Sequence, residues 1–125
     1  MAPTNPQLPL ELKPNHVGAV SIPFGRDELF LVRIDGEVEL LVPMDAPLGW
    51  RYRVLLVPAT FYDQRALLGA GHILPGGHPR GVQMVRGGEM ARFEFEVVAI
   101  TQHGRRCVLA SAIDARWPRL FDLQH

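Results

Sequence analysis

An Asp-Gly pair between two apolar, β-branched runs restricts the fold of this chain more than any other feature. Residues 28–43 read Glu-Leu-Phe-Leu-Val-Arg-Ile-Asp-Gly-Glu-Val-Glu-Leu-Leu-Val-Pro. Asp35 and Gly36 fit the two positive-φ positions of a type I′ turn, whose twist matches that of paired antiparallel strands. The pattern therefore predicts a β-hairpin. The face that this hairpin would turn toward the core holds Leu29, Leu31, Val38, Leu40 and Val42.

A third strand is predicted over 50–57, where apolar and charged residues alternate. Trp50, Tyr52, Val54 and Leu56 would share the core side. If this strand lies antiparallel to 37–43, Arg51 and Arg53 stand beside Glu37 and Glu39. Cross-strand pairs of opposite charge contribute about 0.2–1 kcal/mol each, which favours that register. We therefore expect a meander.

The second half of the chain carries strand signals at 82–86, 91–101 and 106–112. The last two runs flank Gln102-His103-Gly104, which predicts a second hairpin. Their alternation slips at Val97-Val98, as it does at a β-bulge. Before them, Thr60 as an N-cap and Asp63 three residues later predict a short helix near 60–68.

These segments together predict an all-β, mainly antiparallel fold. We expect a small single-domain β-barrel or β-sandwich of about six or seven strands with one short helix. The connections are too short for the helices that usually join parallel strands. Four prolines in residues 1–15 predict an extended N-terminal arm, followed by one β-rich domain over 16–125.

The composition excludes several classes of protein. Thirteen basic and thirteen acidic residues give a formal net charge of zero, which is unlike a protein that binds mainly to phosphate backbones. Near-neutrality also favours association, because it removes long-range self-repulsion. A single cysteine, Cys107, excludes an internal disulfide framework. No secretory leader or run of about 18 apolar residues is visible, so we expect a cytoplasmic protein.

Two histidines in a loop rich in glycine and proline form the main candidate site. Residues 71–79 read Gly-His-Ile-Leu-Pro-Gly-Gly-His-Pro, and His103 lies in the second predicted turn. Neutral imidazoles ligate divalent transition metals, so His72, His78 and His103 are candidate metal ligands. The mixture resembles that of cupin barrels, which hold a metal with three histidines and a glutamate. Five residues separate His72 from His78, whereas one residue separates the cupin histidines. The alternative is an exposed loop with two hydrated histidines.

The arm contains a second candidate site, Gln7-Leu8-Pro9-Leu10-Glu11-Leu12. This hexapeptide resembles the peptide by which bacterial replication and repair proteins dock on the DNA sliding clamp. The resemblance implies that Gln7 enters a polar subsite while Leu8, Leu10 and Leu12 enter an apolar groove. Alternatively, the arm adds an edge strand to its own domain and buries the same leucines.

No catalytic or cofactor-binding residues can be named, because no complete catalytic or phosphate-binding motif is present in the sequence. The leading hypothesis is a non-enzymatic binding module that contacts a protein partner or a second copy of itself. The alternative is a small cupin-like, metal-dependent or ligand-converting enzyme that uses His72 and His78. A third hypothesis is a nucleic-acid-associated accessory protein that docks on the sliding clamp through residues 7–12.

Overall fold

Ten strands form two sheets in the residues that this computed structural model describes, which are 8–74, 81–85 and 87–113. The six-stranded sheet contains, in spatial order, β1 (Leu10–Leu12), β3 (Leu29–Ile34), β5 (Arg51–Pro58), β9 (Ala91–Ile100), β10 (Arg106–Ile113) and β7 (His72–Ile73). The four-stranded sheet contains β2 (Ala19–Val20), β4 (Glu37–Leu40), β6 (Gln64–Leu68) and β8 (Gly81–Val85). These ranges contain no helix, which confirms an all-β chain with more strands than predicted.

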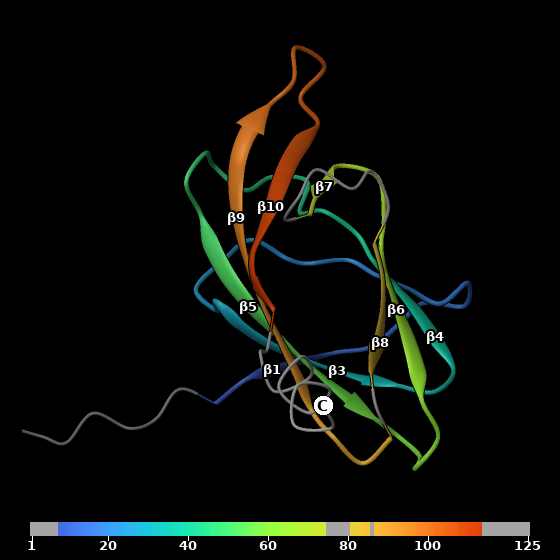
Figure 1. Ribbon diagram of the computed structural model, residues 1–125. Coiled ribbons are helices and arrows are strands. Elements are labelled where there is room, and N and C mark those ends of the chain that lie inside the picture. The colour runs from blue at the N-terminus through green and yellow to red at the C-terminus, as the bar shows by residue number, and fades with distance from the viewer. Residues whose placement is uncertain (1–7, 75–80, 86, 114–125) are drawn as a thin grey trace, which may run out of the picture.

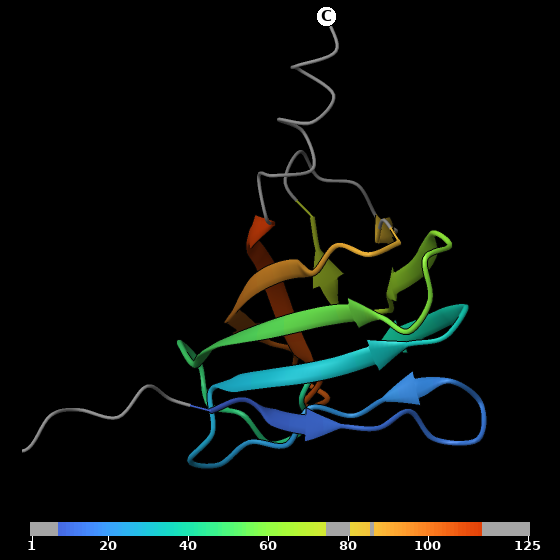
Figure 2. The same ribbon diagram turned by 90° about the horizontal axis from the view of Figure 1, so that it is seen from below.

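The chain crosses between the two sheets at every connection from β1 to β9, and only the β9–β10 connection joins strands of one sheet. Figure 1 shows β4, β6 and β8 on one side of the molecule and β5, β9 and β10 on the other. Figure 2 shows the resulting stack, in which the blue, cyan and green segments lie one above another. The first six strands thus form three successive arches.

The stacked arches make most strand pairs parallel, so the prediction of a mainly antiparallel fold is wrong. Pairs β1–β3, β3–β5, β2–β4, β4–β6 and β7–β10 are parallel. Pairs β5–β9, β6–β8 and β9–β10 are antiparallel. Parallel neighbours need a crossover connection. In the first four of these parallel pairs a strand of the opposite sheet makes that crossover, in place of the helix that we expected to be necessary. Between β7 and β10 the chain passes through both β8 and β9.

The Asp35-Gly36 turn is the top of an arch, so the predicted hairpin is wrong. β3 pairs with β5, and β4 pairs with β6. Gly36 has a φ of 91°, but no non-glycine residue in the described ranges has a positive φ, so Asp35 does not fit a type I′ turn. Because the chain changes sheet at this turn, the residues before and after it do not share one face of a hairpin.

The core face of β3 is correspondingly opposite to the predicted one. Phe30, Val32 and Ile34 are fully buried, whereas Leu29 and Leu31 are half-buried on the outer side. Val38 and Leu40 on β4 face the core as predicted. The predicted core side of β5 is also confirmed, and the buried residues of both sheets form one continuous cluster. The two sheets therefore share a single hydrophobic core.

Gln64, in the segment where the sequence predicted a helix, joins the third arch (β5–β6) to the second arch (β3–β4). Its side chain is buried, and its Oε1 accepts a hydrogen bond from the Gly36 amide. Its Nε2 donates to Thr60 Oγ1 and to the Tyr62 carbonyl, both at 2.8 Å. Residues 64–68 form β6, which pairs with β8. The short helix near 60–68 is therefore wrong, since the inward positions Gln64, Ala66 and Leu68 follow the period of a strand.

The second hairpin is confirmed. β9 and β10 are antiparallel, with Cys107 opposite Ala99 and Val108 opposite Val97. Val98 is therefore the extra residue of a bulge, as the slip in the alternation predicted. No helix in the described ranges is long and apolar enough to cross a membrane.

Candidate functional site

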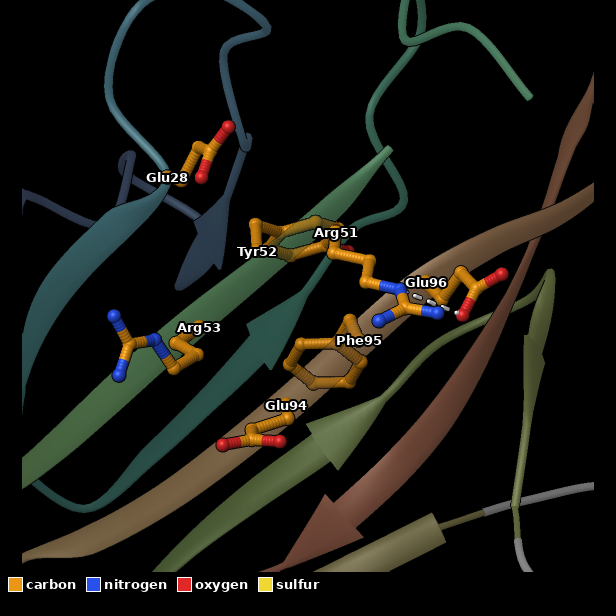
Figure 3. A pocket seen from close by; sticks show the side chains of 7 residues that line it. All are labelled: Glu28, Arg51, Tyr52, Arg53, Glu94, Phe95 and Glu96. Atoms are coloured by element: carbon orange, nitrogen blue, oxygen red, sulfur yellow. Dashed lines mark hydrogen bonds and ion pairs between the residues drawn. The ribbon is translucent and has the colours of Figure 1, made fainter. Parts of the chain in front are cut away.

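A charged groove crosses the outer face of the six-stranded sheet between β5 and β9. It encloses about 380 Å³ and is shown in Figure 3. Five of its lining side chains are charged: Glu28, Arg51, Arg53, Glu94 and Glu96. Tyr52 and Phe95 also line it. Because their side chains belong to the core, the charged residues provide the functional groups that face solvent.

The register of β5 against β9 sets these charges opposite one another. Arg51 lies opposite Glu96, and Arg53 lies opposite Glu94. The Nε of Arg51 lies 3.1 Å from Oε1 of Glu96, in an ion pair whose arginine side chain remains 79% exposed. One strand of the groove is therefore positive and its neighbour is negative.

Half-buried leucines flank the charged groove on the same face of the sheet. Leu29 of β3 is in register with Arg53, and Leu31 is in register with Leu55 of β5. On the other side, Leu109 of β10 lies opposite Glu96. Residues that lie directly opposite one another on adjacent strands point to the same face. The groove is thus a charged centre between apolar margins.

The predicted partners of the two arginines are wrong. Arg51 and Arg53 face Glu96 and Glu94, while Glu37 lies beside Arg65 in the other sheet. The expected pairing depended on β5 lying antiparallel to β4, and these strands belong to different sheets. The alternation of Arg51 and Arg53 and that of Glu94 and Glu96 are visible in the sequence. Their pairing, which for Arg51 and Glu96 spans 45 residues, is a property of the fold.

His72, the first predicted metal ligand, is part of the core. Its ring centroid lies 5.5 Å from that of Phe95, and its Nδ1 donates to the Gly69 carbonyl at 3.0 Å. Its Nε2 is buried and has no hydrogen-bond partner among the described residues. Burial lowers the pKa of His72, and the hydrogen bond to Gly69 opposes this effect in part. The folded state therefore favours the neutral imidazole.

This burial predicts a pH-dependent stability. Unfolded histidine takes up a proton near its ordinary pKa of about 6.5, while folded His72 resists protonation because its pKa is lower. As pH falls below about 6.5, the unfolded state binds the extra proton, and the free energy of unfolding decreases until the folded pKa is reached. The decrease is at most about 1.4 kcal/mol per pH unit.

Urea unfolding of the parent chain, His72→Phe and His103→Gln between pH 5 and 8 measures this contribution. The parent chain and His103→Gln should both lose stability toward acid, because each retains the buried imidazole. His72→Phe should lose less. A pH dependence that is unchanged in His72→Phe would show that another group is responsible.

The other two predicted metal ligands are not brought to His72 by any described contact. His103 lies in the turn between β9 and β10, in a separate hollow from the charged groove. His78 lies outside the described residues. Within the described ranges, no three His, Cys, Asp or Glu side chains are grouped so that they could hold a metal ion. The metal site that includes His78 stays a prediction.

The arm joins the six-stranded sheet through its last residues. β1 pairs with β3, and the Nε of Arg33 lies 3.5 Å from Glu11 Oε2. Leu12 packs against the core, whereas Leu8 is 81% exposed and Leu10 is 40% exposed. Gln7 lies outside the described residues. The edge strand of the alternative is present as β1, but the predicted burial is wrong for Leu8 and Leu10 and holds in part only for Leu12. Docking on a clamp stays a prediction.

Comparisons of this chain with protein-family models, with curated proteins and with solved structures found no match.

Proposed function

We propose that this chain is a non-enzymatic binding module, built as a β-sandwich, which assembles with a second copy of itself through the outer face of β5 and β9. The observation that carries the proposal is the separation of charge on this face. Arg51 and Arg53 form a positive stripe, and Glu94 and Glu96 form a negative stripe beside it. A two-fold interface must be complementary to itself, and these paired stripes meet that condition in one orientation.

That orientation follows from the register. If the two-fold axis runs along the strands, midway between β5 and β9, β5 of each copy lies over β9 of the other. Arg51 then faces the partner's Glu96, and Arg53 faces the partner's Glu94. An axis in the same plane but across the strands would place arginine over arginine and glutamate over glutamate. Charge therefore selects the first arrangement over the second.

The strands that carry the apolar margins lie over one another in the same orientation. The axis that exchanges β5 with β9 also exchanges β3 with β10, because each lies one strand farther out. Leu29 lies at the level of Arg53, whereas Leu109 lies at the level of Arg51 and Glu96. The leucines of one copy therefore lie over the partner strand but are displaced along it from the partner's Leu109. Exposed ion pairs contribute only about 0–1 kcal/mol each, so a stable dimer would also need burial of the apolar margins. The charges determine the orientation.

Charge reversal tests the proposal. We expect the parent chain to dimerise in sedimentation equilibrium, and Arg53→Glu to weaken dimerisation about tenfold or more, because the change acts twice in a two-fold interface. Adding Glu94→Arg to Arg53→Glu should restore the dimer by exchanging the two charges. Arg26→Glu is the matched control, because Arg26 is exposed outside the sheets and the substitution changes the net charge equally.

Two results of these measurements would contradict the proposal. A parent chain that stays monomeric at high protein concentration would reject the proposal. Equal weakening by Arg53→Glu and Arg26→Glu would show that net charge, and not this face, governs association. Circular dichroism of each variant establishes that it folds.

The other two hypotheses remain proposals of lower rank. A metal-dependent enzyme would need His72 to leave the core contact with Phe95 or to bind through its buried Nε2. A nucleic-acid-associated protein docked on the sliding clamp would use Leu8 and Leu10, which are exposed beside the sheet edge. The charged face favours self-assembly over both, because its paired stripes of opposite charge are complementary to a second copy of the same face.

A further inference from the structure

A second hollow lies beside the turn between β9 and β10, which projects from the end of the six-stranded sheet (Figure 1). It encloses about 560 Å³, within the range of about 300–1,000 Å³ that is typical of small-molecule sites. One wall comes from the segment after β4 and the other from the turn. The lining residues are Val42, Pro43, Met44, Thr101, His103, Gly104, Arg105 and Arg106.

The turn wall is basic. It presents the guanidinium groups of Arg105 and Arg106 and the imidazole of His103, and no Asp or Glu of the described ranges lines the hollow. Arg106 donates from Nε to the Ala46 carbonyl at 2.9 Å and from Nη1 to the Gly104 carbonyl at 2.6 Å. Both acceptors are neutral, so these bonds orient the guanidinium without cancelling its charge. The positive charge of this wall therefore favours binding of an anion.

The turn that carries these groups is fixed by its backbone. Thr101 N donates to the Arg105 carbonyl, and Gly104 N donates to the Thr101 carbonyl, both at 2.8 Å. The Arg105 amide donates to Thr101 Oγ1 at 3.0 Å. The Arg105 side chain is exposed and has no hydrogen bond or ion pair with another described residue. The turn thus fixes the backbone of Arg105, while its guanidinium remains able to bind an anion.

The opposite wall is apolar. Pro43 is buried, Val42 is half-buried against the core, and Met44 is 81% exposed. An unbranched, polarisable methionine adapts to ligands of different shape. A ligand that suits both walls has an oxyanion at one end and a short hydrocarbon body at the other.

We infer that this hollow binds a small amphipathic oxyanion, with its carboxylate or phosphate on Arg105 and Arg106 and its hydrocarbon body on Val42 and Met44. The site lies apart from the β5–β9 face, so it is independent of self-assembly. No bond is made or broken in this binding. The affinity for the ligand depends on both its negative charge and its hydrocarbon body. The test therefore varies each of them separately.

Titrations with octanoate and octyl phosphate test the inference, followed by calorimetry and by the backbone amide signals of residues 101–106. We expect one equivalent of at least one of these amphiphiles to bind. Acetate, which lacks the body, and 1-octanol, which lacks the charge, should each bind at least tenfold more weakly. If acetate binds as tightly as the amphiphiles, the site is only a surface ion contact and the inference is overturned.

Two variants and a control locate the ligand. Arg105→Gln should weaken binding of the amphiphile about tenfold, because it removes charge-assisted hydrogen bonds and keeps the backbone bonds of the turn. Met44→Ser should weaken binding of the amphiphile but not that of acetate. Arg26→Gln, an exposed arginine that does not line the hollow, should change neither affinity. Unchanged affinity in Arg105→Gln would overturn the assignment.

Cosedimentation with phosphatidylglycerol vesicles distinguishes a free amphiphile from a membrane lipid. We expect the protein to stay in the supernatant. If the protein instead sediments with the vesicles and Arg105→Gln abolishes this, the site binds a lipid surface and the inference is contradicted.

Discussion

Phe95→Ala is expected to lower the free energy of unfolding by about 3–5 kcal/mol. Phe95 is 1% exposed and packs against three rings. Its centroid lies 5.0 Å from Tyr52 in a stacked pair, 5.5 Å from His72 and 6.0 Å from Phe93. Truncation removes the buried ring, leaves a cavity and also loses the aromatic pair interactions, which contribute about 0.5–1.5 kcal/mol each.

Urea unfolding followed by circular dichroism measures this loss. Phe61→Ala is the matched control, because Phe61 is 91% exposed and undergoes the same chemical change. The control should change stability by no more than about 0.5 kcal/mol. Phe95→Leu should lie between the two, since it keeps most of the volume. A Phe95→Ala variant as stable as Phe61→Ala would show that Phe95 is not at the centre of the core.

Gly71→Ala is expected to cost about 2–4 kcal/mol, because two penalties combine at this position. Gly71 has a φ of 94°, a conformation that residues with a Cβ rarely adopt. An added Cβ would also lie 2.9 Å from the Arg106 carbonyl oxygen and 3.0 Å from Val42 Cγ1. The backbone cannot simply move away, since the Gly71 carbonyl accepts a hydrogen bond from the Val108 amide at 2.8 Å.

Two other glycines separate the penalties in the same unfolding experiment. Gly49 has a φ of 89° with no atom near its Cβ position, so Gly49→Ala should show the backbone penalty alone, about 1 kcal/mol. Gly25 has neither feature, so Gly25→Ala should be close to neutral. If Gly71→Ala costs no more than Gly49→Ala, the close packing of β7 beside β10 is not as tight as described.

Local patterns were sufficient to predict the strands that lie in the middle of the six-stranded sheet. The alternation over 50–57 gave β5 and its core side correctly, and the slip at Val97-Val98 gave the bulge in β9. Each of these signals depends on residues that are neighbours in the sequence. Period-2 alternation reports one buried face wherever the partner strand comes from.

Partner choice could not be predicted in the same way. A glycine turn between two β runs is compatible with a hairpin and with an arch, and the difference at Gly36 involves a hydrogen bond that its amide donates to Gln64 of a later strand. The helix signal at Thr60 and Asp63 failed for a related reason, because β6 gains its pairing with β4 and β8. Tertiary pairing outweighs local propensity in both places.

For the candidate sites too, the residue types were visible in the sequence, whereas their surroundings depend on strand pairing. His72 was identified by its residue type, but its burial against Phe95 depends on β7 lying beside β10. The charged groove was visible as two separate alternations, and only the β5–β9 register joins them. Arg105 and Arg106 of the basic wall are adjacent in the sequence, while the apolar wall opposite them comes from the distant segment after β4.

The repeated passage of the chain from sheet to sheet has a consequence for cooperativity. Because consecutive strands from β1 to β9 alternate between sheets, a cut in the loop between β5 and β6 leaves each fragment with an incomplete part of both sheets. Neither fragment holds a finished sheet, and both expose part of the shared core. Intermediates that retain one complete sheet are thereby disfavoured, and we expect all-or-none unfolding over the strands that the two sheets contain.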